Sequence, residues 1–169
     1  MINYFLKLKR RNFLIYVFLI PILWNILISI TLVYFFDINL SDHKGVPDYS
    51  LYTYIFISVF FAPLYETLVY QFFTIEFFRL LFEKIHKPLL ILISGFLFGF
   101  MHYFNANSYL YSLLAFIMGL FFAFIYEVSK IRKDIKSHFF LVALVHSSVN
   151  LSGSIVSLLI GIIIHYFSQ

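Results

Sequence analysis

Four polar side chains lie inside apolar stretches of this sequence and are candidates for chemistry: Glu66, His102, His146 and Asn150. His146 and Asn150 are four residues apart, so they share a face if their stretch is helical. A carboxylate inside a bilayer costs at least about 2.5 kcal/mol on insertion scales, and such residues usually face the bundle interior and carry function. We therefore expect Glu66 to be a functional residue that the other apolar segments surround.

The types of these residues suit peptide hydrolysis, which needs an activated water and stabilisation of the tetrahedral oxyanion. Glu66 could serve as the general base, while His102 helps to hold the water and shuttle its proton. Alternatively, Glu66, His102 and His146 would bind a divalent metal such as zinc that activates the water. The chain contains no HExxH pattern and no cysteine, so it has no strong metal signature. Whether a metal or no cofactor serves the site stays open.

The composition places these residues in a membrane protein. Of the 169 residues, 62% are hydrophobic and 12% are charged, and the chain contains 24 Phe and 13 Tyr. A soluble domain has roughly 45–50% apolar and 25% charged residues. The sequence therefore predicts an all-α, polytopic integral membrane bundle, with residues 1–169 forming a single membrane domain. The net charge of +4 does not indicate nucleic acid, because the basic residues lie between apolar spans.

Five apolar segments are long enough to form spans, since crossing a bilayer takes about 20 residues. The last one is too short for two spans and long for one, so a broken pair stays open, but we expect one long tilted helix, bent near residues 152–154. The second span contains Pro63, whose missing N–H leaves a carbonyl that needs a protein partner in lipid. The expected spans are Phe13–Phe36, Leu51–Phe78, Leu89–Phe104, Tyr109–Val128 and His138–Tyr166.

The basic residues between the spans predict the topology. Segments 1–12, 79–88 and 129–137 hold 4, 3 and 4 Lys or Arg, whereas 37–50 and 105–108 hold 1 and 0. Because Lys and Arg accumulate in cytoplasmic loops, this alternation predicts a cytoplasmic N-terminus and an outside C-terminus.

Depth within the spans gives a second reason to group the polar residues. At a rise of about 1.5 Å per residue, Glu66 lies about 20 Å from Arg79, and His102 lies about 22 Å from Lys87. Counted in the same way, the polar pair on the last span lies about 15–21 Å from the nearest basic residue. Three helices thus carry polar groups near mid-membrane, where clustering hides them from lipid.

Three short stretches carry a resemblance to a known family: APLYETLVYQF around Glu66, FGFMH from Phe98 to His102, and HSSVN from His146 to Asn150. They resemble, in order, the motifs Glu-Glu-x3-Arg, Phe-x3-His and His-x3-Asn or His-x3-Asp of the CPBP family, also called Abi. This family contains type II CAAX prenyl proteases and bacteriocin-processing and self-immunity proteins. The resemblance covers residues 59–150, which we interpret as the family-like catalytic core.

The resemblance implies that Glu66, His102, His146 and Asn150 are catalytic, with the last two polarising the carbonyl and binding the oxyanion. The first motif departs from the family pattern, because Thr67 replaces its second Glu and Gln71 replaces its Arg. These positions are four apart on a helix, so we expect a neutral hydrogen bond in place of the charged pair.

The sequence therefore favours an intramembrane endopeptidase that hydrolyses a peptide bond with a glutamate-activated water. Its expected partners are the lipid bilayer and a peptide or membrane-protein substrate, with no nucleic acid, and its expected location is a bacterial plasma membrane. One alternative is a non-catalytic bacteriocin self-immunity or membrane-binding protein that retains the site. Another is a proton-coupled transporter using Glu66, against which the lack of an internal repeat counts.

Other ionisable residues are assigned structural places. Glu76 is expected to pair with Arg79, three residues later and near the interface. Four other ionisable residues lie near span ends and are expected at the membrane interface: His86, Glu127, His138 and His165.

Overall fold

The computed structural model describes residues 2–36 and 50–167, and these ranges are helical without a strand. Five helical segments in them are long and apolar enough to cross a membrane. These findings confirm the predicted all-α bundle with five spans. The predicted loop 37–50 lies almost wholly outside the described residues, as does the side chain of His165. The helices outside the second span are α1 (Ile2–Lys7), α2 (Arg10–Phe36), α6 (Lys87–Ala106), α7 (Tyr109–Ile131) and α8 (His138–Phe167).

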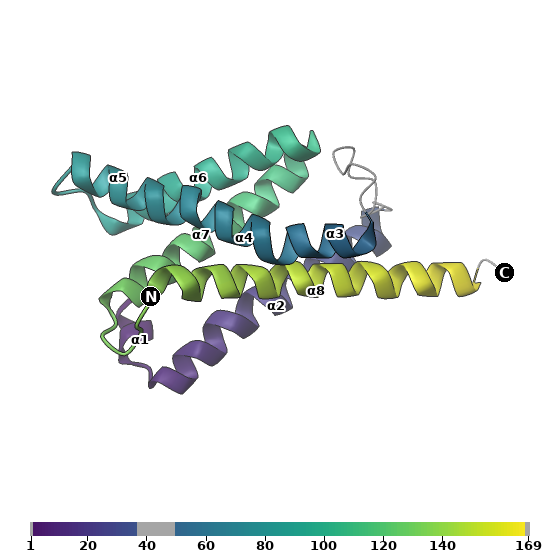
Figure 1. Ribbon diagram of the computed structural model, residues 1–169, viewed down its shortest axis with the longest axis horizontal. Helices are drawn as coiled ribbons and strands as arrows, with labels where there is room; N and C mark the ends of the chain where they lie inside the picture. Colours follow the sequence, from purple (N-terminus) through teal and green to yellow (C-terminus); the bar gives the residue numbers. More distant parts are fainter. Residues whose placement is uncertain (1, 37–49, 168–169) are drawn as a thin grey trace.

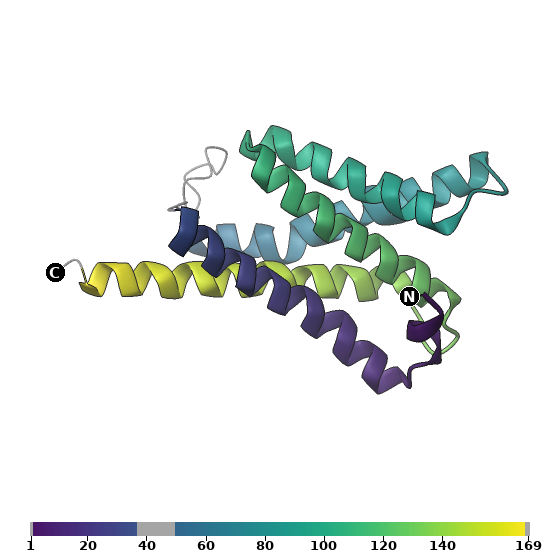
Figure 2. The same cartoon turned by 180° about the vertical axis from the view of Figure 1, so that it is seen from behind.

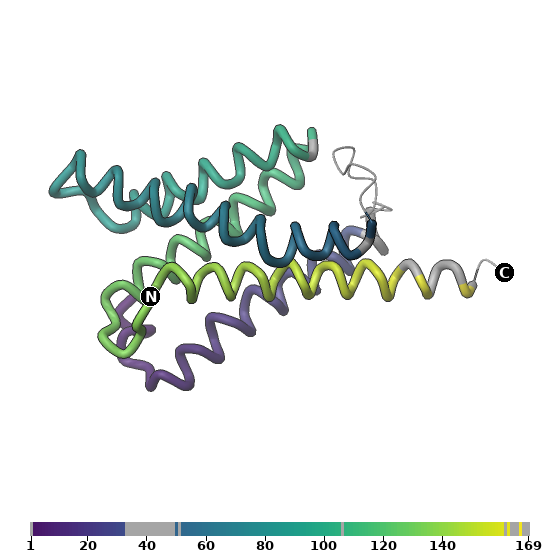
Figure 3. Tube along the Cα trace, viewed as in Figure 1, coloured from purple at the N-terminus to yellow at the C-terminus, as the bar shows by residue number. Residues whose placement is uncertain are grey.

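The second span is a continuous helical path of five pieces. They are α3 (Leu51–Phe56), the π-helical stretch η1 (Ile57–Phe61), α4 (Ala62–Glu66), the π-helical stretch η2 (Thr67–Phe73) and α5 (Thr74–Leu81). Figure 3 shows this path as one trace that begins beside α8 and ends beside α6. Short π-helical insertions are rare and occur frequently at functional sites. Here they flank the single α-helical turn that ends at Glu66.

The basic segments gather at one end of the bundle. Figure 1 shows α1, the start of α2, the α5–α6 loop and the α7–α8 loop at the same end. The α6–α7 turn and the end of α8 lie toward the other end. This arrangement agrees with the alternation of Lys and Arg along the sequence. α8 is one unbroken helix, so the broken-pair alternative is wrong.

The turn between α6 and α7 is short because the C-cap residue of α6 is followed directly by the N-cap residue of α7. Asn107, which follows α6, is left-handed with φ 48°, a conformation that Asn tolerates better than most residues. Ser108 then caps α7 by accepting a hydrogen bond from the Tyr111 amide at 3.3 Å. This short connection makes α6 and α7 an antiparallel hairpin.

Glycines bring the two helices of this hairpin into close contact. A Cβ added at Gly99 would lie 2.8 Å from the Cα of Phe116, and one at Gly95 would lie 2.9 Å from the amide nitrogen of Leu120. The Ser112 hydroxyl also donates to the Gly99 carbonyl at 2.8 Å. Small residues four apart allow such backbone approach in membranes. The Gly95-x3-Gly99 pattern therefore fixes α6 against α7.

Polar contacts, buried or partly buried, hold the remaining helices together. Asn25 of α2 donates to the Val149 carbonyl of α8 at 3.1 Å. Figure 2 shows, from behind, that α2 and α8 cross. At the basic end, Arg132 donates to the carbonyls of Phe5 and Leu8 at 2.6 and 2.9 Å and so holds α1 against the α7–α8 loop. Its hydrogen bonds also hold the pKa of Asp134 below the usual value.

Candidate functional site

Three of the four candidate residues converge where α4, α6 and α8 meet. The Oε2 atom of Glu66 lies 3.7 Å from Nε2 of His102 and 3.6 Å from Nε2 of His146. Both separations exceed a hydrogen bond, so the three atoms surround a common point without binding one another directly. The Glu66 side chain keeps 19% of its surface accessible, whereas that of His146 keeps 4%.

The ring of His102 is oriented by its own helix. Its Nδ1 lies 2.7 Å from the carbonyl of Phe98, the residue one turn earlier in the Phe-x3-His motif. A carbonyl oxygen can only accept, so Nδ1 carries the proton, and the neutral ring presents an accepting Nε2. The motif spacing thus places a hydrogen-bond acceptor toward Glu66.

Aromatic rings enclose His146. Its ring stacks on Phe122 at a centroid distance of 4.4 Å and meets the edge of Phe98 at 5.6 Å. Its Nδ1 is buried and has no hydrogen-bond partner among the described residues. These contacts hold the ring in a largely apolar surrounding with Nε2 directed at Glu66.

Asn150 completes the helix that Pro63 interrupts. In η1 the amide of Ala62 bonds the carbonyl of Ile57, five residues earlier. The next such acceptor, the Ser58 carbonyl, faces Pro63, which has no N–H to donate. Asn150 Nδ2 donates to this Ser58 carbonyl at 2.8 Å. This confirms that the freed carbonyl finds a partner inside the protein, and it leaves Asn150 with one further amide hydrogen.

The two residues that depart from the family motif are fully buried and unpaired. The Thr67 hydroxyl and both polar atoms of the Gln71 amide have no hydrogen-bond partner in the parts of the chain that the structure describes. The expected hydrogen bond between them is therefore wrong. The physical reason is that both lie in η2, where the π-helix aligns residues five apart rather than four.

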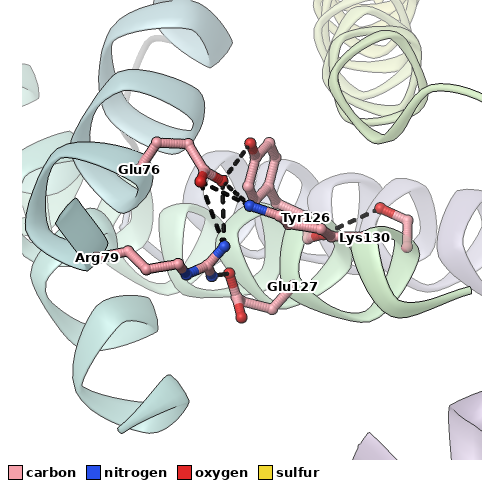
Figure 4. A network of polar contacts seen from close by, with 6 residues as sticks. Glu76, Arg79, Tyr126, Glu127 and Lys130 are labelled. Atoms are coloured by element: carbon pink, nitrogen blue, oxygen red, sulfur yellow. Dashed lines mark hydrogen bonds and ion pairs between the residues drawn. The ribbon is translucent and has the colours of Figure 1, made fainter. Parts of the chain in front are cut away.

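A second polar cluster involves α5, nearer the basic end of the same span. Figure 4 shows its side chains. Glu76 receives hydrogen bonds from Arg79 at 3.3 Å, from the Tyr126 hydroxyl at 2.8 Å and from Lys130 Nζ at 2.6 Å. Arg79 also forms an ion pair with Glu127. The predicted pairing of Glu76 with Arg79 is confirmed.

Glu127 is buried where α7 meets α5. Its side chain is 2% accessible, and its depth near the membrane interface stays a prediction, because burial within the bundle does not measure depth. Burial is tolerated because the Arg79 guanidinium reaches it from α5. The sequence signal for the cluster was the four-residue spacing of Tyr126 and Lys130, which places both on the α7 face that meets Glu76.

The arrangement of the donor atoms does not by itself indicate a metal site. Among the described residues, no group of three or more His, Asp or Glu side chains is arranged to hold a metal ion. Glu66 and the two Nε2 atoms remain the set that would supply ligands. Zinc binding thus stays an untested prediction, and no chemical step below depends on it.

These features define a helical integral membrane protein in which a carboxylate and two histidines from separate spans meet inside the bundle. The family model described as "Type II CAAX prenyl endopeptidase Rce1-like" matches residues 48–152. The match spans more than half of the chain and contains all four candidate residues. The chain belongs to this family, which is one of proteases, and this confirms the resemblance found in the three motifs. No curated protein and no solved structure matches the chain.

Proposed function

We propose that this protein is an intramembrane endopeptidase in which Glu66 activates a water to hydrolyse a peptide bond. The observation that carries the proposal is the position of Glu66 Oε2, 3.7 and 3.6 Å from the two histidine Nε2 atoms. Within the described residues, no Lys or Arg forms an ion pair with this carboxylate. The carboxylate therefore stays available to accept a proton, which a general base must do.

The hydrogen-bonding roles suggest how the water would be held. Nε2 of His102 accepts because Nδ1 donates to the Phe98 carbonyl. A water between Glu66 and His102 can donate one hydrogen to each, which directs an oxygen lone pair at a carbonyl carbon. On attack, Glu66 takes the proton and then delivers it to the leaving amine as the C–N bond breaks.

Two residues of α8 are suited to the developing oxyanion. His146 can donate from Nε2 when its proton resides there, and its Nδ1 has no partner in the described chain that would oppose this tautomer. Asn150 donates one amide hydrogen to Ser58 and has a second for the oxyanion. Donors held in a surrounding that excludes water stabilise such charge more strongly than in solution.

The substrate we propose is a peptide segment that enters from the cytoplasmic side or from the bilayer of a bacterial plasma membrane. The family description adds prenylated CAAX termini as one group to test. Peptide pheromones and bacteriocin precursors are the other groups, because the CPBP resemblance includes processing proteins.

The test uses purified protein with a panel of such peptides in water enriched in oxygen-18. We expect one heavy oxygen in the new carboxylate of each cleaved product, and loss of cleavage in Glu66→Gln. Glu83→Gln is the matched control, because Glu83 is exposed in the α5–α6 loop. No cleavage by wild type, or full cleavage by Glu66→Gln, would contradict the proposal.

A second function, non-catalytic bacteriocin immunity or membrane-protein binding, is favoured by one observation. Thr67 and Gln71 replace a charged pair of the family motif and leave buried polar atoms unpaired among the described residues. If the protein acts by binding, Glu66→Gln should preserve the immunity phenotype in cells at matched abundance. If it acts by cleavage, the same variant should lose that phenotype.

Metal analysis of the same purified samples separates the two hydrolytic chemistries. Stoichiometric zinc that disappears in both His102→Ala and His146→Ala would favour a metalloenzyme. Cleavage that persists after chelation, without stoichiometric metal, would favour a water activated by Glu66 alone.

A further inference from the structure

A groove lies at the basic end of the bundle, away from the candidate active site. It has a volume of about 670 Å³, within the range of small-ligand pockets. Its wall is apolar and comes from the end of α5, the α5–α6 loop and the start of α6. We define the α5–α6 groove by the residues of this wall: Phe78, Phe82, Ile85, Leu89 and Ile93.

The groove is separate from the cluster around Glu66. Phe78 follows Glu66 by twelve residues, which corresponds to about 18 Å along a helix. Glu76 lies between them and, together with Arg79 directly after Phe78, belongs to the ion-pair cluster with α7. The groove therefore lies at the membrane-surface end of the span rather than at its middle.

The rim of the groove carries a net positive charge from two lysines, Lys84 and Lys87, against one glutamate, Glu83, and none of the three forms an ion pair among the described residues. Lys84 and His86 line it beside Glu83, and Lys87 follows at the first turn of α6. Neither lysine forms an ion pair within ranges 2–36 and 50–167. The contrast is with Arg79, which is paired with two glutamates.

We propose that the α5–α6 groove binds an anionic phospholipid of the cytoplasmic leaflet. One acyl chain lies along the wall from Phe78 to Ile93, and the phosphate lies at the rim near Lys84 and His86. Basic pockets between helices at the cytoplasmic membrane surface bind anionic headgroups in this way. The charge at the rim selects this lipid over a zwitterionic one, while the apolar wall would accept the chains of either.

The occupant follows from the chemistry of the wall. A peptide laid in the groove would lose hydration from its backbone N–H and C=O groups, and the apolar wall offers them few partners. An acyl chain makes no such demand. The proposal does not depend on the peptidase function, because it involves none of the residues assigned to hydrolysis.

The experiment is native mass spectrometry of the full chain, after exchange into equimolar phosphatidylglycerol and phosphatidylcholine. We expect selective retention of phosphatidylglycerol, and the combined variant Lys84→Gln with Lys87→Gln should reduce this selectivity by about fivefold for each lysine. Lys9→Gln with Lys136→Gln is the charge-matched control, because both lysines are exposed at the same end. The control should retain the wild-type selectivity.

A second variant tests the wall independently of charge. Ile93→Trp should fill the groove and lower retention of both lipids, with the helical circular dichroism and melting temperature checked to establish folding. Equal retention of both lipids by wild type would overturn the proposal. Equal loss of selectivity in the control variant would also overturn it, since the effect would then reflect overall charge.

Discussion

Two glutamates of one span, ten residues apart, have opposite surroundings. Glu76 accepts hydrogen bonds from Arg79, Tyr126 and Lys130, so its negative charge is compensated. Glu66 has no Lys or Arg partner among the described residues and meets only two histidine Nε2 atoms beyond hydrogen-bond distance.

The difference shows how the structure separates a structural carboxylate from a chemical one. A carboxylate whose lone pairs are used by cations and a hydroxyl holds helices together but cannot readily take a proton. A carboxylate without such donors destabilises a membrane protein, so carboxylates of this kind are usually found where function needs a free base. Glu76 joins α5 to α7, and Glu66 is left for reaction.

The largest expected effect comes from exchanging each carboxylate for its amide. Glu66→Gln should lower peptidase activity by about 10²–10⁴-fold, because it removes the base that accepts the proton of the water. Its folding should survive, since a neutral amide is less costly to bury than a carboxylate. Glu76→Gln should do the reverse and lower the melting temperature while cleavage per folded molecule stays near wild type.

Initial rates and thermal melting of the two variants, normalised to folded protein, measure this contrast. The comparison would fail if Glu76→Gln lost as much activity per folded molecule as Glu66→Gln.

Next in size is the loss of the cation that spans the Glu76 cluster. Arg79→Met leaves Glu127 buried without its ion-pair partner, and stranding a buried charge costs about 3–5 kcal/mol. We expect the lower end, because the Arg79 side chain is 30% accessible. Equilibrium unfolding in mixed detergent micelles measures the change in free energy.

Adding Glu127→Gln to Arg79→Met should recover much of that loss, since no unpaired charge then remains at position 127. If the double variant is no more stable than Arg79→Met, the ion pair does not account for the stability of the cluster.

The position of His102 relative to Glu66 depends on the close packing of α6 against α7. Gly99→Ala places a Cβ 2.8 Å from the Phe116 Cα and should destabilise the protein by about 1–3 kcal/mol, as overpacking does. Activity should fall further than stability explains, because His102 lies one turn beyond Gly99 and would move relative to Glu66. Unfolding and cleavage assays on the same samples measure both effects.

Gly153→Ala is the matched control on α8, where the added Cβ would lie 3.1 Å from the side-chain Nδ2 atom of Asn25. A flexible side chain can move, so a smaller loss is expected. Equal losses for the two variants would show that the α6–α7 contact is not special.

The last prediction concerns the helical turn that leads to Glu66. Asn150→Leu leaves the Ser58 carbonyl without its donor, which should cost about 1–3 kcal/mol. In a Pro63→Ala background the cost should be smaller, because the substituted residue supplies an N–H for the interrupted helix. A double-mutant cycle on unfolding free energies measures the coupling. Additive costs would mean that Asn150 does not compensate for Pro63.

Much of the architecture followed from the sequence alone. Span number and type depend on hydropathy and on the placement of Lys and Arg, which are properties of contiguous segments. The convergence of Glu66, His102 and His146 was predicted for a similar reason, since depth in a helix scales with residue count. The same logic predicted that the carbonyl freed by Pro63 would be buried in protein.

Only the tertiary structure decided which polar groups pair. The burial of Glu127 depends on an arginine that arrives from another helix, and a position near a span end does not reveal it. The unpaired state of Thr67 and Gln71 depends on the π-helical winding of η2, which changes the spacing that aligns side chains. The hydrogen bond from Asn150 to the Ser58 carbonyl also depends on tertiary structure. The amide of Asn150 can reach that carbonyl only after α8 has packed against the second span.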